Sequence, residues 1–130
     1  IAAYDEALRR APDDIEVLNN KGLALQSLGK LQAGLSQHQD ALSSYQQAIA
    51  AYDEALRRAP DYIEVLNNKG LLYVSLGQLQ AVLELETEAL QSLQNALQCL
   101  ERSLAMAPND AFIRKLRDQI QAWLDGEGEP

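Results

Sequence analysis

The chain repeats itself at a distance of 48 residues. Residues 1–29 fall on residues 49–77 and differ from them only at positions 14, 24, 25 and 26. A looser third copy, LQCLERSLAMAPND, begins at Leu97. A unit of this size cannot bury its apolar face alone and must stack on its neighbours. The repeat therefore predicts a solenoid of helical units.

Each unit is predicted to contain two helices, a short helix A followed by a longer helix B. Helix A is expected at about 14–28 and again at 62–76, with Gly29 and Gly77 as its C-terminal ends. Residues 34–61 then repeat a seven-residue phrase in which a small residue precedes Leu or Ile. Residues 79–107 contain neither Gly nor Pro. These features predict an unbroken helix B of roughly 29 residues.

Composition supports an all-α fold and narrows the classes of partner. Apolar residues make up 47% of the chain and aromatic residues only 5%, so Leu and Ala must build the core. The net charge of −8 argues against nucleic acid or an anionic membrane as partner. A single cysteine, Cys99, fits a reducing compartment, and we expect a cytoplasmic protein. Because Ile1 lies within a helical pattern, we expect an excised fragment.

The ordered residues of each unit resemble the tetratricopeptide repeat (TPR) family. The phrases LNNKG and SLGKL are typical of many bacterial and archaeal members. The resemblance implies a TPR-like superhelix built from helix-turn-helix units, a role in protein-protein interaction and no enzymatic activity. It rests in the first copy on Leu18, Gly22, Leu25, Gly29, Ala48, Tyr52, Ala55, Leu56 and Pro60.

The unit departs from the family in length, because a TPR unit has about 34 residues. The surplus corresponds to two heptads, which we assign to helix B. Short A helices would then share long B helices, and each unit would step along the helix axis by about 21 Å. We therefore expect a stretched and staggered superhelix with alternating short A and long B helices.

This interpretation divides the chain into five parts. The C-terminal helix should cap the solenoid through one apolar face formed by Phe112, Leu116, Ile120, Trp123 and Leu124, with basic residues opposite. The expected parts are a partial helix B at 1–12, repeats at 13–60 and 61–108, a capping helix at 109–125, and a disordered acidic tail at 126–130.

Candidate binding residues lie on helix A, which lines the concave face in TPR proteins. The resemblance implies that Asn20 and Asn68 hold the backbone of a bound peptide, since an amide both donates and accepts hydrogen bonds. They would equally be tolerated as polar residues on a solvated face. Glu16 and Glu64 make this face acidic, so a peptide carboxylate is a poor candidate. The full predicted set is Asn19, Asn20, Leu23, Asn67, Asn68 and Leu71.

The alternative function is self-association through the heptad-patterned helix B. An unpaired apolar stripe favours homo-oligomers. His38 interrupts this stripe in the first copy and Glu86 in the second, so a contact between them is possible and would respond to pH. The predicted seam consists of Leu35, His38, Leu42, Leu83, Glu86 and Leu90.

Catalytic and cofactor chemistry has little support in the sequence. The chain has one His and one Cys, without metal-ligand spacing. Its glycines follow the helical pattern and form no phosphate-binding loop. We therefore predict no enzyme activity, no metal and no cofactor, and a protein or peptide as partner.

Overall fold

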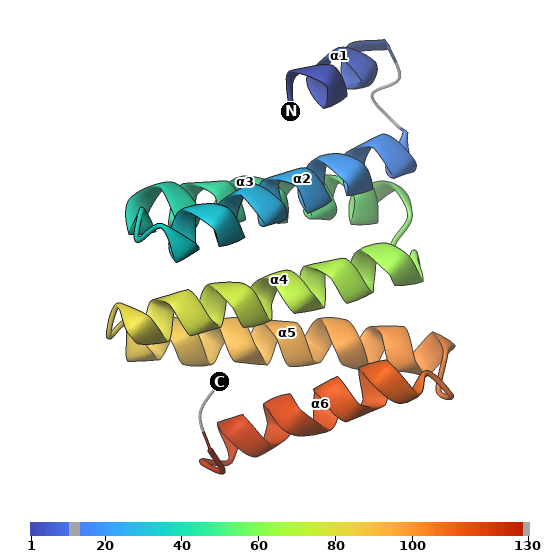
Figure 1. Cartoon of the computed structure of the whole chain (residues 1–130). Helices are drawn as coiled ribbons and strands as arrows, with labels where there is room; N and C mark the ends of the chain where they lie inside the picture. The colour runs from blue at the N-terminus through green and yellow to red at the C-terminus, as the bar shows by residue number, and fades with distance from the viewer. Residues whose placement is uncertain (11–13, 129–130) are drawn as a thin grey trace. The chain divides into compact units, whose positions relative to one another are not determined.

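The computed structural model describes residues 1–10 and 14–128, which form six helices and no strand (Figure 1). Residues 11–13, at the junction of the predicted partial helix B and first repeat, and the last two residues of the predicted tail lie outside this range. Contacts divide the chain into two compact units, Ile1–Val65 and Leu66–Pro130. The helices are α1 (Ala2–Arg10), α2 (Ile15–Gly34), α3 (His38–Arg58), α4 (Ile63–Val82), α5 (Glu86–Met106) and α6 (Ala111–Leu124).

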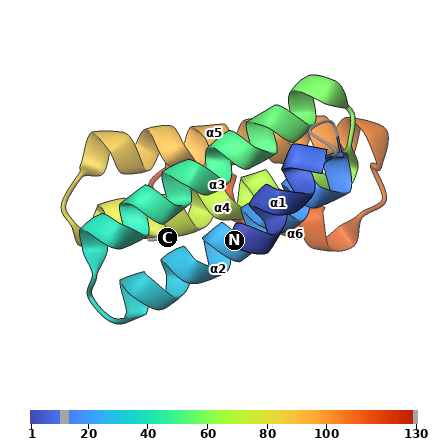
Figure 2. The ribbon, with the colours of Figure 1, turned by 90° about the horizontal axis from the view of Figure 1, so that it is seen from above.

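The all-α fold is confirmed, but the predicted alternation of short and long helices is wrong. Helices α2 and α4 have 20 residues each, and α3 and α5 have 21. Both views show α2 beside α3 as a hairpin (Figures 1 and 2). The surplus residues are thus divided between both helices of a pair. The staggered superhelix loses its basis, and the repeat limits 13–60 and 61–108 stay a prediction.

The turn at residues 35–37 breaks the helix that the heptads predicted as continuous. Ser36 adopts a left-handed conformation with φ 60°, and Glu84 does the same at the equivalent position of the second pair. The Gln37 amide donates to the Gln32 carbonyl at 2.8 Å, and Leu85 donates to Gln80 at 2.8 Å. These bonds, each between residues five positions apart, satisfy carbonyls that the helix end leaves open.

Gly29 lies inside α2 and does not end it, which corrects the predicted boundary. A Cβ added to Gly29 would stand 2.5 Å from the ring of Tyr45 on α3, and one added to Gly22 would overlap the ring of Tyr52. Both tyrosines are buried. The two glycines therefore let α3 bring its large rings against the α2 backbone, as close helix packing requires.

Polar bonds between the paired helices recur in both units. Ser44 on α3 donates to Gln32 on α2 at 2.6 Å, and Ser92 on α5 donates to Gln80 on α4 at 2.6 Å. These bonds satisfy polar groups that the packing buries. They also place the helix ends near the turn side by side in each hairpin.

One buried pair explains a difference between the two copies. In the first unit the Tyr52 hydroxyl donates to Gln26 Oε1 at 2.9 Å. Val74 and Leu100 occupy the equivalent positions of the second unit. A hydrogen-bonded pair is thus replaced by an apolar pair, which leaves no buried polar atom unpaired at this place.

The core of the second unit lies between α5 and α6. Its fully buried members include Leu93 and Leu100 from α5 and Ile113 and Ile120 from α6. Leu116, Trp123 and Leu124 pack against this core as predicted. Phe112 is 64% exposed, so its assignment to the apolar face is wrong. Ile113 takes its place, because it lies three residues before Leu116 and seven before Ile120 and so shares their side of the helix.

Opposite its apolar face, α6 carries polar residues at positions where the equivalent residues of α4 are small or apolar. The equivalents of Leu66, Gly70 and Tyr73, shifted by 48 positions, are Arg114, Asp118 and Gln121, and all three side chains are exposed. Charged groups at such positions would lose their hydration if a further helix packed there. A polar outer face of this kind is what a capping helix needs, and the capping role of α6 stays a prediction.

The left-handed turn residues generate a stability prediction. Replacing Ser36 by Gly removes the side-chain clash of that conformation and should raise the free energy of unfolding by about 0.5–1 kcal/mol. The control is Ser43→Gly on the exposed surface of α3, which should lower stability by about 0.5 kcal/mol. Urea unfolding followed by circular dichroism measures both. A loss of stability in Ser36→Gly equal to that of the control would contradict the turn.

The glycines in the hairpins generate a second prediction from a matched pair. Gly29→Ala must displace the Tyr45 ring and should cost about 1–3 kcal/mol. At Gly77 the nearest atoms to an added Cβ are 3.4 Å away, which is ordinary contact. Gly77→Ala should therefore gain about 0.5–1 kcal/mol from helix propensity. Thermal unfolding of both variants separates the outcomes, and equal effects at the two sites would rule out the ring contact.

Candidate functional site

The first set of predicted binding residues lies on the middle of α2. Leu23 is 36% exposed and Asn20 is half-buried, and the two share one side of the helix because they are three residues apart. Asn19 is only 3% exposed, so its amide is largely withdrawn from a partner. The surface that α2 offers is therefore formed by Asn20 and Leu23.

The second set lies at the equivalent positions of α4. Asn67, Asn68 and Leu71 are all half-buried. The Oδ1 atom of Asn67 is buried and has no hydrogen-bond partner among the described residues. Asn68 and Leu71 repeat the spacing of Asn20 and Leu23. Each A-type helix thus carries one copy of the same polar and apolar pair.

The structure does not form the continuous seam that the sequence predicted. Leu35 and Leu83 lie in the turns between helices, and His38 and Glu86 begin α3 and α5. Leu42 is half-buried and Leu90 is 49% exposed. The Nδ1 atom of His38 is buried without a hydrogen-bond partner among the described residues. His38 and Glu86 belong to different units, and a contact between them stays a prediction.

An ion pair joins α1 to α2 in the first unit. Lys21 Nζ lies 2.6 Å from Asp5 Oδ1. This hydrogen bond and the lysine charge lower the pKa of the exposed Asp5 carboxyl. Because the pKa is lowered in the folded chain, the ion pair contributes to the free energy of unfolding at pH values above the ordinary pKa of aspartate. This contribution is lost as the pH falls and the carboxyl becomes protonated. Within the hairpin, burial raises the pKa of Tyr52 and keeps its hydroxyl as a donor to Gln26.

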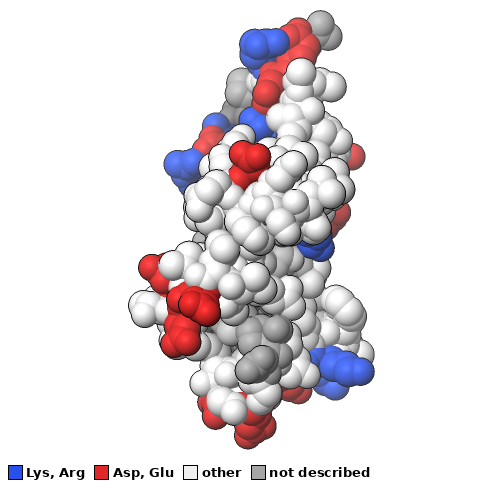
Figure 3. Space-filling model, turned by 60° about the vertical axis from the view of Figure 1, so that its left-hand side comes forward, with Lys and Arg blue, Asp and Glu red and all other residues white. Residues whose placement is uncertain are grey.

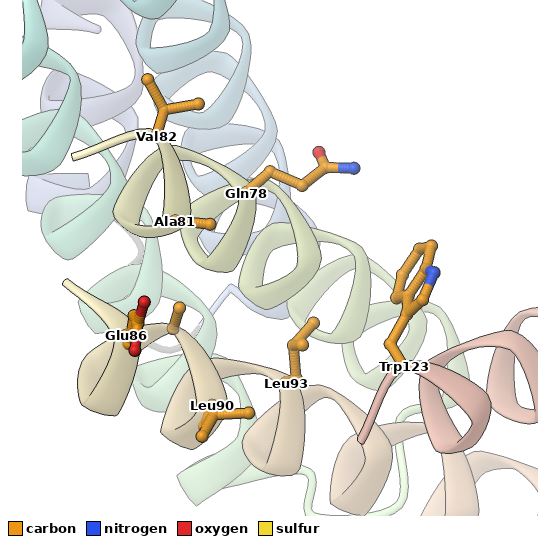
Figure 4. A pocket seen from close by; sticks show the side chains of 8 residues that line it. Gln78, Ala81, Val82, Glu86, Leu90, Leu93 and Trp123 are labelled. Carbon is orange, nitrogen blue, oxygen red and sulfur yellow. The ribbon is translucent and has the colours of Figure 1, made fainter. Parts of the chain in front are cut away.

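An apolar groove that sequence reasoning missed lies in the second unit. It has a volume of about 560 Å³ and opens between the end of α4, the start of α5 and the end of α6. Figure 4 shows Val82 and Gln78 on the α4 side, Glu86, Leu90 and Leu93 on α5, and Trp123 at the end of α6. The available signal in the sequence was the short C-terminal helix at the third helix A position, for which only a capping role was predicted.

The described residues offer no metal centre and no membrane span. They hold no group of three or more His, Cys, Asp and Glu side chains that could bind a metal ion. None of the helices in this part of the chain has the length and apolar character needed to cross a membrane. Cys99 is 5% exposed and occupies the position of Ala51, a packing role for a small side chain.

A comparison with models of protein families identifies the family of this chain. A family model described as tetratricopeptide repeat matches residues 34–111, which is more than half of the 130 residues. The chain belongs to the tetratricopeptide repeat family. The matched stretch contains α3, α4 and α5, and TPR repeats are generally protein-protein interaction modules. No curated protein matches this chain.

Proposed function

We propose that this TPR chain is a non-enzymatic scaffold that binds protein segments through the Asn and Leu pair that each of α2 and α4 carries. Family membership carries the proposal, because TPR units generally bind proteins. The two copies of an Asn and Leu pair, at 20 and 23 and at 68 and 71, supply the chemistry. An amide can hold a peptide backbone, while Leu covers an apolar side chain.

The acidic residues on α2 and α4 indicate which kind of partner segment can bind there. Glu16 and Glu64 are exposed in the first turns of α2 and α4. A free C-terminal carboxylate would approach like charges there, which costs affinity and slows association. We therefore propose an internal, extended segment of the partner rather than its C-terminus.

Self-association is a second candidate, through Leu31 together with Leu35, one residue of the predicted seam. Leu31 and Leu35, at the end of α2 and in the following turn, are 61% and 60% exposed. Neighbouring exposed leucines of this kind favour a contact with another molecule. Sedimentation equilibrium of the chain and of its Leu31→Glu, Leu35→Glu variant tests this. A monomer at all concentrations in both would exclude this candidate.

Binding through the asparagines is tested with peptides selected from a displayed library on the wild-type chain. The Asn20→Ala, Asn68→Ala double variant should bind the selected peptides at least about tenfold more weakly, a loss of about 1.4 kcal/mol. Fluorescence anisotropy with labelled synthetic peptides measures the affinity.

The matched control is Asn109→Ala, which removes an exposed amide from the turn between α5 and α6. It should leave peptide affinity unchanged. Circular dichroism checks that all variants remain helical. Unchanged binding by the double variant would exclude the two asparagines as peptide contacts, whereas an equal loss in Asn109→Ala would show that the effect is not local.

A further inference from the structure

Helix α6 ends earlier than the helix whose position it repeats. It begins at Ala111, which is 48 residues after Ile63 at the start of α4. It has 14 residues, however, whereas α4 has 20. Asp125 caps its end, and the Asp125 amide donates to Gln121 at 2.9 Å. The third helix A therefore lacks its last six positions, which correspond to about 9 Å of helix.

The groove described above lies beside the end of this shortened helix. Leu93 forms its floor with 2% exposure, while Leu90 is 49% and Val82 is 70% exposed at its sides. Trp123, in the last turn of α6, stands at the end where the helix stops (Figure 4). A helical segment of about two turns would complete the missing length and cover these apolar side chains.

Glu86 is the one charged residue that lines the groove, and further acidic residues neighbour the lining residues in sequence. Glu84, Glu86 and Glu88 are exposed around the α4–α5 turn, and Asp125 and Glu127 are exposed after α6. No Lys or Arg occurs between positions 70 and 101. Figure 3 brings forward the side of this turn and shows a group of acidic side chains with no Lys or Arg inside it. An occupant with positive charge therefore fits this rim.

We propose that the groove binds a basic amphipathic helix of another protein. Its apolar side would lie on Leu90, Val82 and Trp123, and its Lys or Arg residues would face the glutamates of the α4–α5 turn. Helix-in-groove binding of this kind uses apolar anchors spaced by three and four residues. A second copy of this chain is disfavoured as occupant, because each copy carries a net charge of −8. The inference does not depend on the asparagine face proposed above.

The test uses a synthetic helix of about four turns, with Leu at positions spaced by three and four and Lys at the remaining ones. Two matched probes replace all Lys by Glu, or scramble the order so that the Leu residues no longer share a side. Trp123 is the single tryptophan of the chain and reports directly from the groove. Its fluorescence maximum and its quenching by acrylamide follow binding of each probe.

The Lys helix should shift Trp123 emission to shorter wavelength and protect it from acrylamide. It should bind at least about tenfold more tightly than the Glu helix, and added salt should weaken it because the rim is exposed. Leu90→Glu and Val82→Glu should abolish binding. The control Phe112→Glu, at an exposed apolar residue on α6 that does not line the groove, should leave binding unchanged.

A charge-reversed variant keeps the test decisive if a leucine variant fails to fold. Glu84→Lys, Glu86→Lys and Glu88→Lys together change only exposed residues and should invert the preference toward the Glu helix. Equal binding of the Lys, Glu and scrambled probes, or an unchanged Trp123 spectrum, would overturn the proposal. A concentration-dependent shift without probe, with dimers in sedimentation, would assign the groove to a second copy and also overturn it.

Discussion

The hairpin of two equal helices depends on the contact between tyrosine rings and helix glycines. Gly22 and Gly29 leave the backbone of α2 open to the rings of Tyr52 and Tyr45. These two contacts bring helices of 20 and 21 residues close enough for the Gln32–Ser44 bond near the turn. The turn follows from this contact, because α3 can return along α2 only if the chain reverses at residues 35–37. The second unit keeps the geometry with leucines, which need less space.

Much of the fold could be predicted from sequence because its signals are periodic. The repeat, the helical pairs and the polar outer side of α6 all follow from spacing. The turn could not be found in the same way. Its left-handed residues are Ser36 and Glu84 rather than glycine, whereas Gly22 and Gly29 serve packing inside α2. The heptad phrase also runs across the turn, since both helices of a hairpin bury small residues against each other.

Candidate site residues could be predicted from the sequence only where the same residue type recurs at equivalent positions of the two copies. Asn20 and Asn68 could be selected by their equivalent positions, but the burial of Asn19 depends on packing that one helix alone does not reveal. The groove beside Trp123 depends on the length difference between α4 and α6. A helix that ends early covers only part of the preceding hairpin and leaves apolar residues beyond its end open. The same C-terminal segment thus packs on the core of the second unit and leaves a surface open.

The position of the turn is most directly tested by nuclear Overhauser effects between Tyr45 and Gly29 in the unmodified chain. The two residues are sixteen positions apart, and a continuous helix would separate them by about 24 Å. The hairpin predicts strong effects from the Tyr45 ring to the α protons of Gly29, and from the Tyr52 ring to those of Gly22. Absence of both effects, together with unbroken helical connectivity across residues 31–58, would contradict the account.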